Sequence, residues 1–172
     1  MDPSEQQAVP NPHTLFIART LIFIRNNNRF LFIKGSPDKH TWPNLYNAIG
    51  GHIEKNESIT TSLFRELSEE TGLTQENIHN LRFDGAITIT LPEESPNIIL
   101  LIFSGFSTTT NVKESSEGTL HWLSPDDLSS VPTVADIPLL IEQVLKADDT
   151  NTPFTGHYWY DTDGNLKITF SD

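Results

Sequence analysis

The sequence predicts an α/β fold in which helices flank a mixed β-sheet. Short runs rich in Ile, Leu and Phe, which are typical of strands, recur along the chain. Two longer segments, after residue 58 and at residues 135–146, instead carry apolar residues at helical spacing. Because strands and helices follow one another in mixed order, a mixed sheet with helices packed on it fits best.

The first half of the chain begins with a predicted hairpin. Residues 1–13 are polar and contain three prolines, so we expect a loose tail, and residues 14–172 then form a single domain. Residues 14–25 and 29–35 read as strands joined by a turn of asparagines, which tolerate left-handed backbone conformations. A proline-containing loop at 36–44 follows, and residues 45–49 lead into paired glycines, which let the backbone approach a ligand closely.

A helix with a strongly acidic face is predicted next. Ser58 suits its N-cap, and Gly72 suits the left-handed position after its last turn, near residue 71. Glu66, Glu69 and Glu70 fall within about a 100° arc of the helix surface, where like charges are destabilising unless something offsets them. The apolar side comprises Leu63, Phe64 and Leu67. We therefore expect the glutamates to face a cleft and bind a hard divalent cation; the alternative is a solvated acidic helix with ion pairs.

The second half of the chain supplies the rest of the sheet. The expected elements are strands at 81–90, 98–106 and 119–123, a helical turn from Ser124, a helix at 135–146 and a terminal hairpin of strands 156–160 and 166–170. Ser followed by Pro favours the start of a helical turn, and Asp163-Gly164 favours a tight hairpin. The polar stretch 147–155 is interpreted as a linker.

The composition excludes several kinds of partner and site. The formal net charge of −12 argues against a broad nucleic-acid or membrane surface, so an anionic ligand needs a metal or local Lys and Arg side chains. The absence of Cys excludes disulfides, thiolate metal ligands and Cys nucleophiles. Apolar runs fall short of the roughly 18 residues of a membrane-spanning helix, and no signal-peptide core is seen, so a cytoplasmic location is expected.

The acidic segment resembles the Nudix box, G-x5-E-x7-R-E-U-x-E-E-x-G-U, in which U is a bulky apolar residue. Every fixed position is matched without a gap, by Gly51, Glu57, Arg65, Glu66, Leu67, Glu69, Glu70, Gly72 and Leu73. Asn56 stands where many members have Gly, but Asn also tolerates the left-handed conformation. The resemblance implies the Nudix α/β/α sandwich and a loop-helix-loop that binds Mg²⁺ or Mn²⁺ and a diphosphate.

The resemblance also implies roles within the box. Glu69 and Glu70 correspond to principal metal ligands, and Glu66 to a residue that is the general base in some members and a metal ligand in others. Arg65 corresponds to the Arg that orients the glutamates, through Glu57 and Glu69. Gly51, Glu57 and Gly72 are then structural. Such a cluster suits diphosphate hydrolysis, which needs charge neutralisation, an oriented water and a base.

Further metal ligands are expected outside the helix. The backbone carbonyl of Gly50 can supply one oxygen. Glu117, in the loop before the strand at 119–123, is the expected distant ligand. An exposed loop acid is the alternative interpretation of Glu117, and Glu114 is a weaker choice of ligand.

Three further features resemble MutT-like enzymes that hydrolyse oxidised purine nucleoside triphosphates. Asn47 falls where those enzymes place a base-recognising Asn, although it can equally stabilise a turn. Asp136 falls near a base-contacting Asp, although it also suits the first turn of a helix. The aromatic residues of the terminal hairpin form either packing contacts or a stacking wall. Lys34 is either a phosphate ligand or a surface residue, and the loop residues that can border the base are Lys39, His40 and Trp42.

The sequence thus predicts a Mg²⁺-dependent Nudix pyrophosphohydrolase, with Mn²⁺ as a possible substitute. The best substrate is an (8-oxo-)purine (deoxy)nucleoside triphosphate, cleaved to monophosphate and diphosphate. ADP-ribose or a dinucleoside polyphosphate is the alternative substrate, and a non-catalytic Nudix ligand-sensing module is the alternative of another class. We expect a small-molecule nucleotide as partner, neither nucleic acid nor membrane, and a monomer or homodimer.

Overall fold

One mixed β-sheet of eight strands organises the molecule, for which a computed structural model describes residues 15–91 and 95–171. The tail expected at residues 1–13 lies outside the described residues. The strand order is β3-β2-β1-β5-β4-β7-β8, and β6 pairs with β2 off this path. The strands are β1 (Phe16–Asn26), β2 (Arg29–Gly35), β3 (Tyr46–Asn47), β4 (Ile78–Ile89), β5 (Asn97–Ser107), β6 (Gly118–Leu123), β7 (Phe154–Tyr160) and β8 (Leu166–Ser171).

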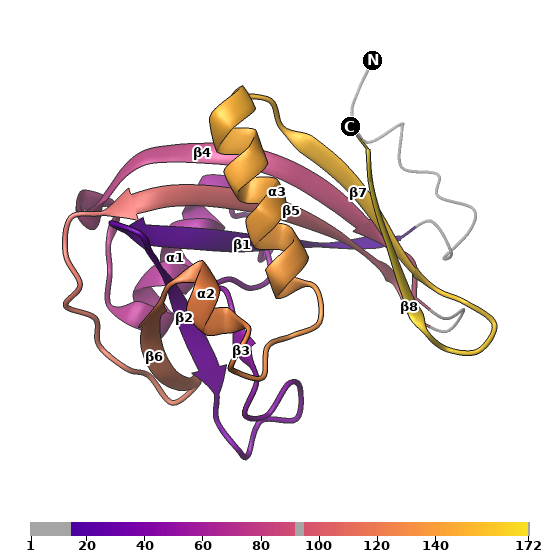
Figure 1. Cartoon of the computed structure of the whole chain (residues 1–172), viewed down its shortest axis with the longest axis horizontal. Coiled ribbons are helices and arrows are strands. Elements are labelled where there is room, and N and C mark those ends of the chain that lie inside the picture. The colour runs from indigo at the N-terminus through magenta and orange to yellow at the C-terminus, as the bar shows by residue number, and fades with distance from the viewer. Residues whose placement is uncertain (1–14, 92–94, 172) are drawn as a thin grey trace.

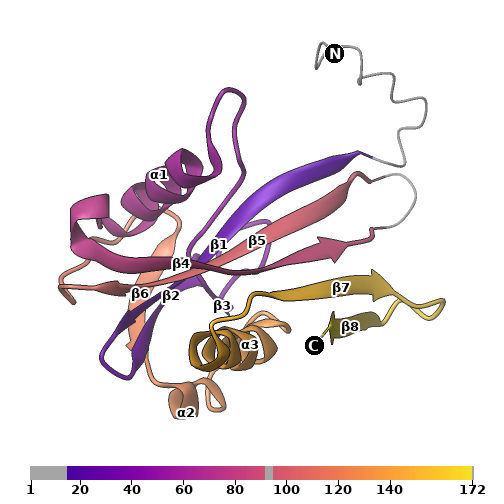
Figure 2. The same cartoon turned by 90° about the horizontal axis from the view of Figure 1, so that it is seen from above.

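Helices cover both faces of this sheet. The helical elements are α1 (Ile59–Thr71), the 3₁₀ turn η3 (Gln75–Asn77), α2 (Pro125–Leu128) and α3 (Ile137–Thr150). Strand β1 runs parallel to β5, and β4 runs parallel to β7, whereas the other pairs are antiparallel. Figures 1 and 2 show α1 on one face of the sheet and α3 on the other. The predicted α/β/α sandwich with a mixed sheet is therefore confirmed.

Side-chain alternation in the central strands separates two hydrophobic cores. Leu21 and Phe23 of β1 belong to the core that α3 covers, whereas Ile22 and Ile24 belong to the core that α1 covers. Successive residues of a strand point to opposite faces, so a strand buried on both faces is apolar throughout. Each fully buried side chain of this kind stabilises the fold by about 1.5–3 kcal/mol.

Helix α1 begins and ends where the sequence predicts. The Ser58 hydroxyl accepts a hydrogen bond from the backbone N–H of Thr61 at 3.1 Å. Gly72 adopts the left-handed conformation with φ 72° and donates its N–H to the Ser68 carbonyl at 2.9 Å. These caps satisfy groups that the helix ends would otherwise leave unpaired, and they fix where the acidic face lies along the sheet.

The prediction of a polar linker at residues 147–155 is wrong. Helix α3 continues to Thr150, where Asn151 ends it with φ 52°, and β7 already begins at Phe154. Asp148 suggested a linker because it is charged, but it lies on the helix and forms an ion pair with Arg25 at 2.9 Å. Ala147, one residue before it, is buried in the core.

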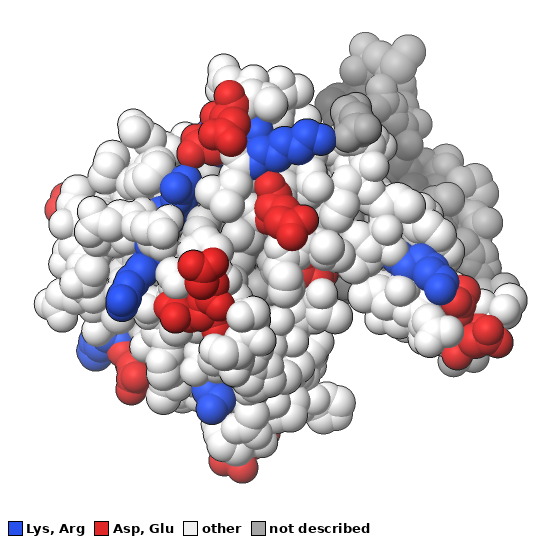
Figure 3. Space-filling view, in the orientation of Figure 1, with Lys and Arg blue, Asp and Glu red and all other residues white. Residues whose placement is uncertain are grey.

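Charged side chains of both signs are intermixed on one face of the molecule (Figure 3). On the face that carries α3, Lys and Arg side chains lie scattered among Asp and Glu side chains (Figure 3). Within residues 15–91 and 95–171, no helix combines the length and apolar character needed to cross a membrane.

Candidate functional site

An ion network on α1 forms the centre of the site. Arg65 binds Glu57 bidentately, through Nε at 2.7 Å and Nη2 at 3.0 Å. Its Nη1 donates to Glu66 at 2.9 Å and to Glu69 at 3.2 Å. Nη2 also donates to the His52 carbonyl at 3.0 Å. This bond connects the helix to the loop that carries Gly50 and Gly51, called the glycine loop below. The contacts expected between Arg65 and both Glu57 and Glu69 are therefore present, and the hydrogen bond from Arg65 holds the pKa of Glu57 below its ordinary value.

Glu70 differs from its neighbours because it is buried. Only 8% of Glu70 is exposed, and its carboxylate accepts the Gly50 N–H at 3.2 Å. Burial raises the pKa of Glu70 to about 7, and the charges of Glu66 and Glu117 add to this effect. A buried carboxylate with so little compensation is costly to ionise, and a divalent cation beside it would remove that cost.

The acidic side chains offer the right chemistry for a hard cation, although they do not form a closed cage. Among the described residues, no three His, Asp or Glu side chains are gathered as a ready metal site. Glu66 and Glu69 bind Arg65 instead, while Glu70 turns to Gly50. All three are carboxylates on adjacent turns of one helix, and oxygen ligands are what Mg²⁺ and Mn²⁺ prefer. The donor set therefore fits either ion.

The two glycines before the helix are needed for close approach. A Cβ at Gly51 would collide with the Glu66 carboxylate, and a Cβ at Gly50 would collide with the Thr20 carbonyl of β1. Strand β1 binds this loop on either side of Gly50, because the N–H groups of Thr20 and Ile22 donate to the carbonyls of Gly51 and Ile49 at 2.9 and 2.8 Å. Gly50 is thus held between two residues whose carbonyls are bound to β1.

Alanine at Gly51 should lower turnover, whereas alanine at Gly50 should lower stability. In Gly51→Ala the methyl group meets only the end of the Glu66 side chain, so the fold should survive while turnover falls about tenfold or more. In Gly50→Ala the methyl group meets the β1 backbone, and the strain should lower the free energy of unfolding by about 1–3 kcal/mol. Thermal melts and initial rates of both variants test this. Equal loss of stability in the two would contradict the placement of Glu66 over Gly51.

Glu117 lies close enough to the acidic helix for its charge to act on Glu70. It forms an ion pair with Lys39 at 2.6 Å, and the charges of both residues act on the pKa of Glu70. The Glu117 carbonyl also accepts the Ser36 N–H at 3.0 Å, which joins the two loops. The weaker choice, Glu114, instead accepts the Leu120 N–H at 3.4 Å.

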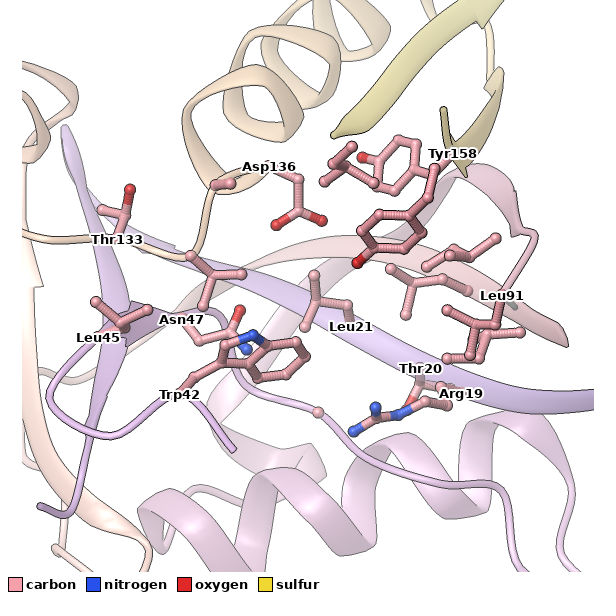
Figure 4. A pocket seen from close by; sticks show the side chains of 18 of the residues that line it. Arg19, Thr20, Leu21, Trp42, Leu45, Asn47, Leu91, Thr133, Asp136 and Tyr158 are labelled. Atoms are coloured by element: carbon pink, nitrogen blue, oxygen red, sulfur yellow. The ribbon is translucent and has the colours of Figure 1, made fainter. Parts of the chain in front are cut away.

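A cavity of about 780 Å³ lies between the sheet, the start of α3 and the terminal hairpin, and its lining includes Gly50, whose N–H donates to Glu70 of the acidic helix. This volume falls within the range that small-molecule sites occupy. Its walls are largely apolar and include Leu21, Leu45, Ile89, Leu100, Val134 and Leu166. Figure 4 shows the carboxylate of Asp136 and the hydroxyl of Tyr158 directed into this space. The cavity thus has an apolar body with a few polar groups.

Asp136 and Tyr158 direct polar atoms into the cavity (Figure 4). Asp136 occupies the N-cap position of α3 but its side chain makes no capping hydrogen bond, which disfavours the capping interpretation. Burial raises the pKa of Asp136. Within the described part of the chain, the buried Tyr158 hydroxyl has no hydrogen-bond partner. A ligand with hydrogen-bonding groups would satisfy the Tyr158 hydroxyl and meet the Asp136 carboxylate in the same space (Figure 4).

The other predicted substrate residues divide between the cavity and its surroundings. Asn47 lines the cavity and also stabilises its own turn, because its Oδ1 accepts the Ala48 N–H at 2.9 Å. Trp42 lines the cavity as well. Lys34 is not brought there; its Nζ lies 5.8 Å from the ring centroid of Tyr46.

Arg19 is a lining residue that sequence reasoning missed. It lies on β1 between the cavity and the acidic helix. Burial lowers the pKa of Arg19, while the charges of Glu66 and Glu70 raise it. A charged residue in the apolar run LFIARTLIFIR was the available signal.

Comparison with known proteins agrees with this geometry. The family profile described as "NUDIX domain" matches residues 15–143. The chain is 25% identical to the NAD-capped RNA hydrolase NudC of Vibrio atlanticus (strain LGP32) over 126 residues, covering 73% of this chain and 43% of that protein. It is 33% identical to the uncharacterized Nudix hydrolase YvcI of Bacillus subtilis (strain 168) over 103 residues, covering 58% and 63% respectively. It therefore spans less than two thirds of either relative.

A solved structure shows the same fold. The mutator MutT protein from Bacillus halodurans superposes with a TM-score of 0.72 at 23% identity, covering 91% of this chain and 98% of that one. The match to the family profile extends over most of the chain and includes the whole acidic helix and its glycine loop. The chain therefore belongs to the Nudix family.

Proposed function

We propose that this protein is a metal-dependent pyrophosphohydrolase that cleaves the diphosphate linkage of a nucleotide. The observation that carries the proposal is the position of the acidic cluster. Gly50 and Arg19 both line a cavity that is large enough for a nucleoside. Gly50 donates its N–H to buried Glu70, and the charges of Glu66 and Glu70 act on Arg19, so this end of the cavity is next to the acidic cluster. The polyphosphate would then meet the carboxylates, while the base occupies the cavity.

One group of residues would hold the metal ion, and another would position the reactants. Glu66, Glu69 and Glu70, with the Gly50 carbonyl and Glu117, would hold Mg²⁺ or Mn²⁺. Such an ion, when bound, neutralises phosphate charge and lowers the pKa of a bound water.

Arg65 fixes the geometry in which water attacks. It holds Glu66 over Gly51, where that carboxylate serves either as a ligand or as the base that takes the proton of the attacking water. The water oxygen bonds to phosphorus, the phosphoric anhydride bond breaks, and the leaving phosphate carries away the negative charge.

The cavity favours a purine nucleotide as substrate. Its apolar walls suit the faces of a base, and Asn47, Asp136 and Tyr158 offer hydrogen bonds to its edge. We propose an (8-oxo-)purine (deoxy)nucleoside triphosphate, hydrolysed to monophosphate and diphosphate. A second candidate, a dinucleotide-type diphosphate such as ADP-ribose or a dinucleoside polyphosphate, is supported by the similarity to the NAD-capped RNA hydrolase.

A substrate panel tests the proposal. Purified protein is incubated with 8-oxo-dGTP, dGTP, dATP, ADP-ribose, NAD⁺ and diadenosine tetraphosphate, with Mg²⁺ or Mn²⁺, and the products are separated by chromatography. We expect 8-oxo-dGTP to give the monophosphate and diphosphate, and EDTA to abolish the reaction. Activity that persists in EDTA would contradict the metal-dependent mechanism. Tight binding without cleavage of any compound would favour a ligand-sensing module instead.

A further inference from the structure

Arg19 lies where the cavity meets the acidic helix (Figure 4). It lies on β1, two residues before Leu21, and both residues line the cavity. Its backbone forms an isolated antiparallel bridge with His52, immediately after the glycine pair. Gly51, next to His52, lies directly under the Glu66 carboxylate. In Figure 4 the guanidinium of Arg19 lies on the side of the cavity away from Asp136 and Tyr158.

The charge of Arg19 is not compensated by a bound carboxylate, as the charges of Arg25, Arg65 and Arg82 are. Among the residues that the structure describes, its guanidinium makes no hydrogen bond or ion pair, although it is partly buried. By contrast, Arg25, Arg65 and Arg82 each bind a carboxylate within 3 Å. A partly desolvated guanidinium without a partner is costly, and an anion that enters the cavity would lower that cost.

Metal binding strengthens this argument. The two carboxylates whose charges act on Arg19 are those of Glu66 and Glu70. When these carboxylates bind a divalent cation, the ion neutralises their negative charge, and they no longer compensate the positive charge of Arg19. The guanidinium would then be free to bind a phosphate, whose oxygens match its planar fork of N–H donors.

We propose that Arg19 is a specificity-determining residue that binds the phosphate group next to the nucleoside of the substrate. This inference rests on the proposed function, in which the nucleoside fills the cavity and the outer phosphates reach the acidic helix. Between these two regions, the first phosphate passes the position that Arg19 occupies. Arg19 therefore selects nucleotides over nucleosides and fixes how far the phosphate chain extends toward Glu66 and Glu70.

Binding of GMP and guanosine, measured by isothermal titration calorimetry with Mg²⁺ present, tests this assignment without requiring turnover. The measured quantity is the ratio of the two dissociation constants, which isolates the contribution of the phosphate. In the wild type GMP should bind more tightly than guanosine. In Arg19→Gln this advantage should fall by about ten- to a hundredfold, as for loss of a charge-assisted hydrogen bond, while guanosine affinity stays the same. Arg19→Lys should lose only part of it, because the charge remains and the fork is lost.

Arg29→Gln is the matched control. Arg29 is exposed at the turn between β1 and β2 and does not line the cavity, so its loss changes the net charge equally but leaves the phosphate advantage intact. The assignment is overturned if GMP gains nothing over guanosine in the wild type, or if Arg19→Gln keeps the wild-type ratio. Equal weakening of both ligands would also overturn it, since Arg19 would then only shape the cavity. The substrate panel separates this result from the proposed function, because hydrolysis by the wild type does not depend on the calorimetric ratio.

Discussion

Glu70→Gln should remove most of the activity and yet make the metal-free protein more stable at pH 8. Turnover should fall by about 100-fold or more, since an amide cannot neutralise the charge of a divalent cation. The gain in stability follows from burial. Ionised Glu70 is 8% exposed with a single hydrogen bond from Gly50, whereas a neutral glutamine keeps that bond without the cost of a buried charge.

The pH dependence of this gain has a definite sign. Burial raises the pKa of Glu70 from 4.5 to about 7, so the folded protein holds this proton more tightly than the unfolded chain does. Below pH 4.5 both states are protonated and Glu70 costs nothing. As the pH rises from 4.5 to about 7, the wild type progressively loses stability relative to the variant, by about 3 kcal/mol in total. The difference should then stay constant above pH 7.

Thermal unfolding of both proteins in EDTA, from pH 4.5 to 8, measures this difference. Glu69→Gln is the control, because the Glu69 side chain is 61% exposed and its neutralisation relieves no burial, although it too should impair turnover. Adding Mg²⁺ at pH 8 should raise the melting temperature of the wild type and leave that of Glu70→Gln nearly unchanged. If Glu70→Gln is no more stable than the wild type at pH 8, the ionised Glu70 carboxylate does not destabilise the metal-free protein, and the prediction is contradicted.

The acidic helix could be predicted almost completely from the sequence because its determinants are local. The N-cap Ser58, the left-handed Gly72 and the apolar Leu63 and Leu67 lie within one short segment, and each acts on its near neighbours. The contact between Arg65 and Glu69 is likewise a one-turn spacing on a helix. A periodic pattern carries such information directly.

The cavity and the burial of Glu70 could not be predicted in the same way. Glu66, Glu69 and Glu70 look equivalent on a helical projection, but only Glu70 is buried and accepts the Gly50 N–H of the glycine loop, which β1 holds in place from far away in the sequence. Arg19 and Asp136 are 117 positions apart and both line the cavity, only because the sheet and α3 pack together. Such placements depend on tertiary packing, which residue spacing does not encode.

The helix-capping interpretation of Asp136 also makes a separable prediction. An N-cap residue replaced by Ala costs about 0.5–2 kcal/mol. Since the Asp136 side chain makes no capping bond and its pKa is raised by burial, Asp136→Ala should cost no stability. Thermal melts at pH 7 decide whether Asp136 caps the helix, in which case Asp136→Ala lowers stability, or instead serves the cavity, in which case stability is kept.

Asp136→Asn should change which purine the protein prefers. The guanine edge presents adjacent N–H donors, and a carboxylate accepts from both, whereas adenine pairs an acceptor with a donor. An asparagine offers one acceptor and one donor, so it matches adenine and opposes guanine. We expect the ratio of kcat/KM for 8-oxo-dGTP to that for dATP to fall by about ten- to a hundredfold, with metal dependence unchanged. Asp126→Asn, on the exposed first turn of α2, should keep the wild-type ratio. If Asp136→Asn keeps it as well, the carboxylate seen in the cavity does not read the base, and selection must come from Asn47 or the aromatic wall.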